Sequence, residues 1–271
     1  MTSLLGKVYL IGAGPGAQDL MTMRGAKELA RAQIVFYDAL VDPQMLELCP
    51  QARLVAVGKR CGKLSTAQKF IEKQLIDAAK KYQHIVRLKG GDPMIFGRAD
   101  EEIVTLSKHG IEIEVIPGIT CASAAAASLQ SSLTLRGVAR SVAFVTMSRA
   151  TDTQMPQEIP NADTLVYYMG RKDGVSIARQ LIASGRDLTT PVVIIEAIST
   201  KKERKLFTTL NGLEEGVLDH WSDADLPAIL LVGQAFARVS MQQLCLEDVV
   251  HRELNNGLQD LITFTDSRRS A

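Results

Sequence analysis

The chain has 271 residues, enough for two domains of ordinary size. Apolar types make up 46% and charged types 23% of the residues, which is typical of a folded globular protein and excludes a disordered one. Lysine and arginine number 31 and aspartate and glutamate 30, so the formal net charge is +1. This balance argues against a protein that holds nucleic acid by bulk charge.

Cysteine and histidine placement gives no sign of a metal site. The four cysteines (Cys49, Cys61, Cys121 and Cys245) are far apart and lack the spacing of a zinc site or a disulfide framework. The histidines are isolated from one another as well. The apolar runs are far shorter than the ~20 residues that a bilayer requires, and no export signal is recognised. We therefore predict a cytoplasmic protein with no membrane or nucleic-acid partner and no metal.

Strands and helices alternate through the first half of the chain. Apolar runs predict strands within 7–16, 32–40, 53–58, 84–93 and 111–118, and helices are predicted within 22–32, 66–82, 99–110 and 121–130. In the helix over 66–82 the apolar residues at helical spacing are Phe70, Ile71, Leu75, Ile76 and Ala79. Alternating strands and helices predict a mostly parallel sheet with helical crossovers.

The pattern restarts after Arg140. Strands are predicted at 141–147, 163–170, 190–198 and 226–233, with a helix over 173–184, an exposed hairpin or loop without a site at 201–205, and a terminal helix with a frayed tail at 246–271. We predict an α/β protein with an N-terminal domain (1–137), a smaller C-terminal domain (138–245) and the tail.

The first glycine cluster, Gly12 to Gly16, directly follows a predicted strand. Glycines there allow a tight turn or the approach of a ligand to main-chain amides, and both interpretations stay open. A dinucleotide loop would place its third glycine one residue later, and Pro15 removes an amide donor. Asp38 lies at a plausible distance for such a cofactor.

The second cluster reads RLKGGDP over 87–93, followed by Phe96, Gly97 and Arg98. It presents Asp92 at the carboxyl end of a strand, the edge where ligands bind in open α/β sheets. Asp92 can instead close a turn, and we interpret Asp100, Glu101 and Glu102 as caps of the following helix. Arg98 is predicted to have a functional role.

A third small-residue segment, PGITCAS over 117–123, precedes an alanine-rich helix. Cys121 in it is interpreted as a small core residue rather than a nucleophile, because no histidine neighbours it. Five bases and no acid lie between Glu47 and Glu72, and three bases and no acid lie between Glu114 and Asp152. These windows favour a small anionic ligand over a polymer, although ordinary solvated lysines explain them equally well.

Together these segments resemble uroporphyrinogen-III C-methyltransferases, a group of the tetrapyrrole methylase superfamily that acts at the entry to sirohaem, cobalamin and haem d1 synthesis. The resemblance covers about residues 7 to 235 and is carried by VYLIGAGPG, IVFYDAL, VGKR, RLKGGDPMIFGR, VIPGITCAS, LTLRG and TLVYYMG, in that order. It implies two α/β domains with an active-site cleft between them and a homodimer. It also implies two methyl transfers from S-adenosylmethionine to C2 and C7 of uroporphyrinogen III, giving precorrin-2 and S-adenosylhomocysteine.

The resemblance also assigns residues. It implies cofactor contacts at Pro15, Gly90, Gly91, Asp92, Ile95, Thr120, Cys121, Met169 and Ile198. It places Asp38 at the position of a proton acceptor, Lys59 at that of a proton donor, and Arg98 at that of an arginine acting on the substrate. Arg60 and Arg136 are expected to pair with the substrate's acetate and propionate arms.

The chain departs from the family pattern at four places: Leu135 replaces the histidine of LTHRG, Met147-Ser148 replace Gly-His, Ile198-Ser199 replace Gly-Thr, and Ala99-Asp100 replace the glycines after Arg98. Three alternatives therefore stay open. They are a methylase of a later corrinoid intermediate, a relative that binds tetrapyrrole or cofactor without turnover, and a nucleotide-dependent oxidoreductase that uses the loop at Gly12.

Overall fold

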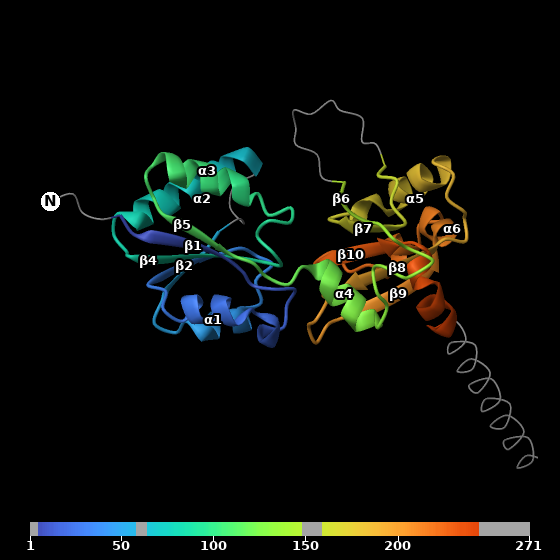
Figure 1. Cartoon of the computed structure of the whole chain (residues 1–271), viewed down its shortest axis with the longest axis horizontal. Helices are drawn as coiled ribbons and strands as arrows, with labels where there is room; N and C mark the ends of the chain where they lie inside the picture. The colour runs from blue at the N-terminus through green and yellow to red at the C-terminus, as the bar shows by residue number, and fades with distance from the viewer. Residues whose placement is uncertain (1–4, 58–63, 148–158, 244–271) are drawn as a thin grey trace, which may run out of the picture. The chain divides into compact units, whose positions relative to one another are not determined.

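The computed structural model describes residues 5–57, 64–147 and 159–243, with only the backbone of 64–67. It divides into two compact units (Figure 1). The first runs to Ser128 and also contains Glu196–Arg204 and Asp225–Pro227, whereas the second contains Leu129–Ile195, Lys205–Ala224 and the chain from Ala228 onward. The domain limits 1–137 and 138–245 stay a prediction, and the predicted tail lies outside the described residues.

The first unit is built on a five-stranded sheet in the order β3-β2-β4-β1-β5. Every strand pair is parallel, so the central strand β4 lies between β2 and β1 with all carboxyl ends at one edge. The strands are β1 (Lys7–Gly12), β2 (Ile34–Tyr37), β3 (Arg53–Ala56), β4 (His84–Lys89) and β5 (Ile113–Ile116).

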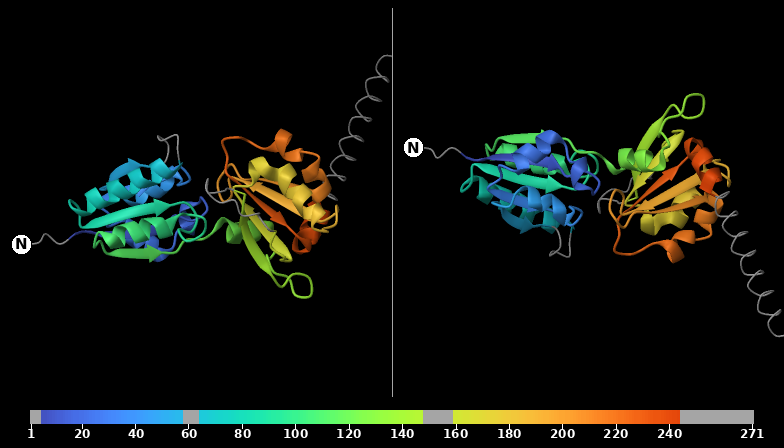
Figure 2. Two further views of the ribbon diagram at one scale, coloured as in Figure 1. Left: turned by 90° about the horizontal axis from the view of Figure 1, so that it is seen from above. Right: turned by 90° about the horizontal axis from the view of Figure 1, so that it is seen from below.

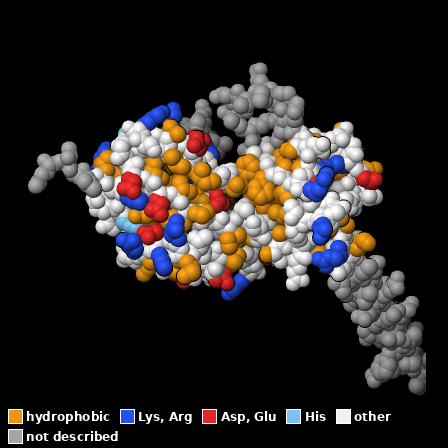
Figure 3. All heavy atoms as spheres, viewed as in Figure 1, with side chains coloured by type: hydrophobic (Ala, Val, Ile, Leu, Met, Phe, Trp, Pro, Cys, Tyr) orange, Lys and Arg blue, Asp and Glu red, His pale blue; other side chains and the backbone are white. Residues whose placement is uncertain are grey.

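Helices cover both faces of this sheet (Figures 1 and 2). α1 (Met23–Leu29) lies on one face, and α2 (Leu64–Ala79) and α3 (Ala99–Lys108) lie on the other. Because side chains alternate along a strand, Leu10 packs in the core under α2 and α3, and Ile11 packs in the core on the opposite face. A further helix, α4, spans Cys121–Leu129, and all but its last residue belong to this unit. Two short 3-10 helices, η1 (Gln18–Leu20) and η2 (Pro43–Leu48), also lie in it. In Figure 3 acidic and basic side chains are interspersed on the visible face of this unit.

The apolar stripe of α2 is narrower than its sequence pattern predicted. Ile71, Leu75 and Ala79 are buried, but the side chain of Phe70 is 55% exposed. At 3.6 residues per turn, Phe70 lies about 140° around the helix from Leu75, which places it on the outer side. The assignment of Phe70 to the core face is therefore wrong.

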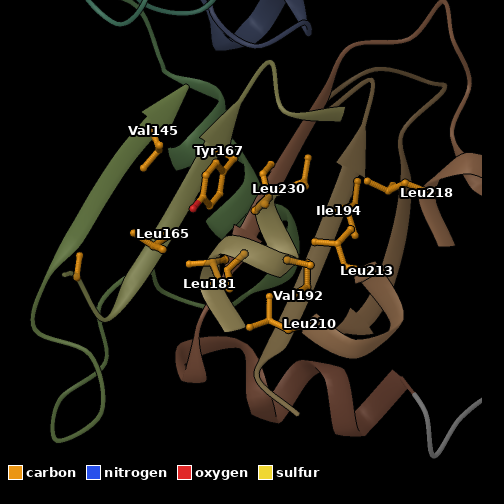
Figure 4. Packing of buried hydrophobic residues seen from close by; sticks show 14 residues of the cluster. Val145, Leu165, Tyr167, Leu181, Val192, Ile194, Leu210, Leu213, Leu218 and Leu230 are labelled. Carbon is orange, nitrogen blue, oxygen red and sulfur yellow. The ribbon is translucent and has the colours of Figure 1, made fainter. Parts of the chain in front are cut away.

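The second unit contains a five-stranded mixed sheet in the order β6-β7-β10-β8-β9. β6 and β7 are parallel, and β7 and β10 are antiparallel. The elements are β6 (Val142–Thr146), β7 (Thr164–Tyr168), β8 (Pro191–Glu196), β9 (Arg204–Thr209), β10 (Ala228–Val232), α5 (Gly174–Ala183), α6 (Leu210–Glu214) and α7 (Val217–Trp221). Figure 4 shows its core, where Leu181 of α5 and Leu213 of α6 pack with the sheet residues.

The predicted α/β fold class is confirmed, with a wholly parallel first sheet and a mixed second one. β9, α6 and α7 had no counterpart among the predicted elements. Of the described part of the chain, no helix is both long and apolar enough to traverse a bilayer.

Candidate active site

Three glycine-containing loops meet at the carboxyl edge of the first sheet. After β1 and β4, Gly14 and Gly91 exchange two backbone hydrogen bonds, 3.1 and 2.7 Å long. A Cβ on Gly118, after β5, would lie 2.2 Å from the carbonyl oxygen of Gly91, and one on Gly12 would lie 2.6 Å from the Cα of Gly118. Glycine is required at Gly12 and Gly118 because the loops touch through their backbones.

Gly91 is a glycine for a different reason. Its φ is +68°, and a Cβ there would meet no atom within 4 Å among the described residues. The backbone at Gly91 is therefore open on one side, which leaves room for a ligand to approach the main chain.

Asp92 links two of these loops. Its Oδ1 accepts a hydrogen bond from the Met94 amide at 2.8 Å, and its Oδ2 accepts one from the Gly118 amide at 3.0 Å. The first bond closes the turn that was one of the two interpretations of Asp92. The second fixes the loop that precedes Thr120. Asp92 therefore orders the edge whether or not a ligand also uses it.

The segment Glu196–Arg204 packs on the first loop. The Ala17 amide donates to Ser199 Oγ at 3.0 Å, and a Cβ on Gly16 would lie 2.8 Å from the Ile198 carbonyl oxygen. The Ile198 side chain itself is buried. This brings the backbone of Ile198 beside the loop that contains Pro15.

Glu203 holds this segment in place. Its carboxylate accepts hydrogen bonds from the Ser199 amide at 2.7 Å and from the Ser128 hydroxyl. Next to it Arg204 begins β9 and pairs with the buried Glu196. The exposed hairpin or loop predicted at 201–205, with no site implied, therefore contains two residues with structural partners. No sequence pattern indicated these partners, because they are distant along the chain or lie across a hairpin.

Asp38 lies beside the second loop, just after β2. Its Oδ1 accepts from the Leu40 amide at 3.2 Å, and its Oδ2 is 3.8 Å from Nη2 of Arg87. A Cβ on Gly90 would lie 2.8 Å from the Cβ of Leu40, so the two loops are neighbours. The side chain of Asp38 is 27% exposed and is accessible to a ligand at this edge.

Glu102 is not a helix cap. It is fully buried and lies 3.3 Å from both Arg87 Nε and Lys89 Nζ, where Gln68 also donates to it. The prediction that the acids at 100–102 only cap α3 is therefore wrong for this residue. Two bases at alternate positions of an otherwise apolar strand, Arg87 and Lys89, were the signal for a buried acidic partner.

Arg98 precedes α3 in a left-handed conformation, with φ of 55°. Its Nε and Nη2 both donate to the carboxylate of Glu101, each at 2.7 Å. This pairing raises the pKa of Arg98, so the guanidinium stays charged. A substrate carboxylate that binds Arg98 would do so beside Glu101.

The start of α4 carries two further predicted residues. The carbonyl of Thr120 accepts from the amides of Ser123 and Ala124, which opens the helix. Burial raises the pKa of the Cys121 thiol, which favours the interpretation of Cys121 as a packed residue rather than a nucleophile. Ile95 is half-buried in the turn after Asp92, and its amide donates to the Asp92 carbonyl.

The remaining predicted residues lie elsewhere. Met169 and Arg136 belong to the second unit, where both are exposed. Met169 follows β7 with a φ of 57°. Lys59 and Arg60 lie outside the described residues. The first unit alone thus brings together Pro15, Asp38, Gly90, Gly91, Asp92, Ile95, Arg98, Thr120, Cys121 and Ile198 on the loops at one edge of its sheet.

Comparison with known proteins identifies the architecture. Residues 7–214 match the model of the tetrapyrrole (corrin/porphyrin) methylases. The chain belongs to this family. The tetrapyrrole methylase resemblance seen in the sequence is therefore confirmed.

Two curated relatives show how far the similarity extends. The chain is 40% identical over 245 residues to a uroporphyrinogen-III C-methyltransferase of Pseudomonas aeruginosa, covering 89% of this chain and 98% of that protein. It is 44% identical over 233 residues to a siroheme synthase of Pseudomonas fluorescens, covering 84% of this chain. The chain spans about half the length of the siroheme synthases that it matches.

A solved methylase structure has the same fold. The uroporphyrin-III C-methyltransferase of Thermus thermophilus, complexed with S-adenyl homocysteine, is 36% identical with a TM-score of 0.73. The match covers 86% of this chain and 99% of that one.

Proposed function

We propose that this methylase transfers two methyl groups from S-adenosylmethionine to C2 and C7 of uroporphyrinogen III, forming precorrin-2 and S-adenosylhomocysteine. The observation that carries the proposal is the 40% identity to a uroporphyrinogen-III C-methyltransferase over almost the full length of that protein. The interlocked loops support it, because they keep Asp38 and the open backbone of Gly91 at one edge.

The residues present fit a nucleoside cofactor. The backbone at Gly91 is open. Thr120 and Cys121, which follow the Gly118 that touches Gly91, are small and half-buried. We propose that the cofactor is held by Gly90, Gly91, Asp92, Ile95, Thr120, Cys121, Pro15 and Ile198 of the first unit, with Met169 of the second. When bound, S-adenosylmethionine supplies a methyl group on a sulfonium, so the protein has no strong nucleophile to generate.

The chain's own residues then align the reactants and handle protons. A new C–C bond at a pyrrole carbon has to be followed by loss of a proton from the macrocycle. Asp38, a partly exposed carboxylate beside Arg87, is proposed as the acceptor, and Lys59 as a proton donor. Arg98, Arg136 and Arg60 are proposed to bind the carboxylate arms.

We also propose that the protein works as a cytoplasmic homodimer with the active site in a cleft between its two domains. These points rest on the family resemblance.

The test is anaerobic incubation of the purified protein with uroporphyrinogen III and S-adenosylmethionine, followed by mass analysis. We expect a product two methyl groups heavier. Methylation of a later corrinoid but not of uroporphyrinogen III would support the first alternative. Binding of S-adenosylhomocysteine without methyl transfer would support a non-catalytic relative, and binding of a pyridine nucleotide instead would support an oxidoreductase.

Arg98 is tested by Arg98→Ala. We expect turnover to fall at least tenfold while the fold is retained, because the side chain is partly exposed and its pairing with Glu101 is a surface one. Unchanged turnover with uroporphyrinogen III would remove Arg98 from the site.

A further inference from the structure

A buried charged network lies directly behind Asp38. Arg87 and Lys89 of β4 point to the face of the sheet that α2 and α3 cover, since they alternate with Val86 and Leu88 of the opposite core. Glu102 of α3 binds both of them, and Gln68 of α2 donates to Glu102 at 3.2 Å. Asp38 completes the network at the sheet edge.

Burial increases towards the interior of this network. Glu102 is fully buried, and Arg87 and Lys89 are 3% and 5% exposed. Asp38 is the member that reaches the surface. Two cations and two carboxylates balance one another, so the network carries no net charge when all four are ionised. Burial also lowers the pKa of Lys89, because it disfavours the charged ammonium group.

Packing alone gives a poor reason for the network. Apolar residues of similar size often stabilise a core as well as buried ion pairs do, because the desolvation of charges is costly. A neighbouring residue of the same face, Ile85, is apolar and fully buried. The network therefore calls for another explanation, and its geometry supplies one.

The guanidinium of Arg87 is fixed on three sides. Its Nε donates to Glu102 Oε1 at 3.3 Å, and its Nη1 donates to the backbone carbonyls of Leu88 and Phe36 at 3.0 and 3.5 Å. The remaining nitrogen, Nη2, faces Asp38 Oδ2 at 3.8 Å. Glu102 thus determines where Arg87 points, and Arg87 places a fixed positive charge beside Asp38.

We propose that Glu102 and Arg87 are positioning residues for Asp38: Glu102 orients the guanidinium of Arg87, and Arg87 holds the Asp38 carboxylate for proton transfer from the methylated macrocycle. This inference rests on the proposed function of the site. Among the described residues, the charges placed around Asp38 are Arg87 and, behind it, Lys89 and Glu102. Lys89 contacts the same carboxylate oxygen of Glu102 as Arg87 does, so both cations lie beside one acid.

The test compares Glu102→Gln with Asp100→Asn, a matched change at an exposed position of the same helix. We expect Glu102→Gln to lower kcat about 10- to 100-fold, the range that misplacement of a catalytic group produces. The affinity for S-adenosylhomocysteine, measured by calorimetry, should stay within about twofold, since a single lost hydrogen bond elsewhere costs little at the ligand. Asp100→Asn should behave as the original protein in both assays.

The pH profile separates positioning from a merely structural role. Loss of the Glu102 charge leaves the cations around Asp38 less compensated, so the acid limb of kcat should move to lower pH in Glu102→Gln. Arg87→Gln removes a cation and should move the same limb to higher pH. Arg87→Lys keeps the positive charge but loses the planar guanidinium donors. The acid limb of its kcat profile should therefore lie at the pH seen in the unsubstituted protein, while kcat itself stays low.

Each result decides something. If the unsubstituted protein methylates uroporphyrinogen III and Glu102→Gln has the same kcat and pH profile, the positioning role is overturned. The proposed function then still stands. An original protein that transfers no methyl group overturns both. If Glu102→Gln does not fold, as judged by circular dichroism, the two Arg87 variants decide the question. A shift of the acid limb to higher pH in Arg87→Gln but not in Arg87→Lys supports the positioning role, and the same limb in both variants overturns it.

Discussion

Gly91 and Gly110 form a matched pair that separates backbone strain from ligand contact. Their φ angles are +68° and +69°, and at neither would a Cβ meet an atom of the described residues within 4 Å. Gly110 lies between α3 and β5, at the edge of the sheet where β5 begins. Gly91 lies among the glycine loops at the opposite, carboxyl edge. Alanine at either position therefore introduces the same strain in two different surroundings.

The magnitude follows from the left-handed conformation. An L-residue in this conformation destabilises the folded state by about 1–2 kcal/mol. Alanine also lowers the conformational entropy of the unfolded chain, which stabilises the folded state by roughly 0.4–1 kcal/mol. Gly91→Ala and Gly110→Ala should each lower the free energy of unfolding by about 1 kcal/mol. Only Gly91→Ala adds a methyl group where we place the cofactor, so its affinity for S-adenosylhomocysteine should fall at least tenfold, or about 1.4 kcal/mol.

Urea denaturation gives the stabilities, and calorimetric titration with S-adenosylhomocysteine gives the affinities. Equal affinities of the two variants would refute the placement of the cofactor at Gly91. Unequal stabilities would refute the reasoning from φ alone, because a close contact would then have to exist at one of the two positions.

Three further predictions concern packing and pH. Gly118→Ala should cost about 3 kcal/mol, because its Cβ would meet backbone atoms of Gly91 and Gly12 that no side-chain rotation can move; urea denaturation tests this, and a stability loss no larger than that of Gly110→Ala would contradict it. Leu75→Ala should destabilise by about 2–5 kcal/mol and Phe70→Ala by about 0.5 kcal/mol or less, so similar losses in thermal melts would restore Phe70 to the core. Burial lowers the pKa of His84 below 6.5, so its contribution to stability is present above that pH and is lost as the pH falls through the lower folded-state value. Urea midpoints between pH 7.5 and 5 should therefore fall more steeply for the original protein than for His84→Gln.

The first unit was predicted well because its strands are buried on both faces and therefore read as continuous apolar runs. β1 and β4 are examples, and the glycines after them marked the sheet edge. The prediction for Phe70 was wrong because the residue is apolar but lies on the exposed side of α2. β9 was missed because its residues are only partly buried and begin inside a run of charges at 201–205.

The site was predictable only where its chemistry is local in sequence. Asp92 and the turn at Met94 are two residues apart, and the sequence already indicated both. Glu203 and Ser199 could not be found, because their roles depend on Ser128 and Ala17, far away along the chain. For Glu102 the helix was predicted but the burial was not. Its burial depends on Arg87 and Lys89 of the neighbouring strand.

Within the first unit, strained backbone occurs in the loops of the candidate site. Six non-glycine residues in the described part of the chain have positive φ. Phe96, Arg98, Ala197 and Ser199 belong to the first unit, and Gln130 and Met169 belong to the second. Such conformations cost of order 1–3 kcal/mol each and persist only where the surroundings fix them. Arg98 is fixed by Glu101, and Ser199 by Glu203 and Ala17. Glu101 and Glu203 therefore support loop geometry. The proposed role of Glu102 is of the same kind, since it would support Asp38 through Arg87.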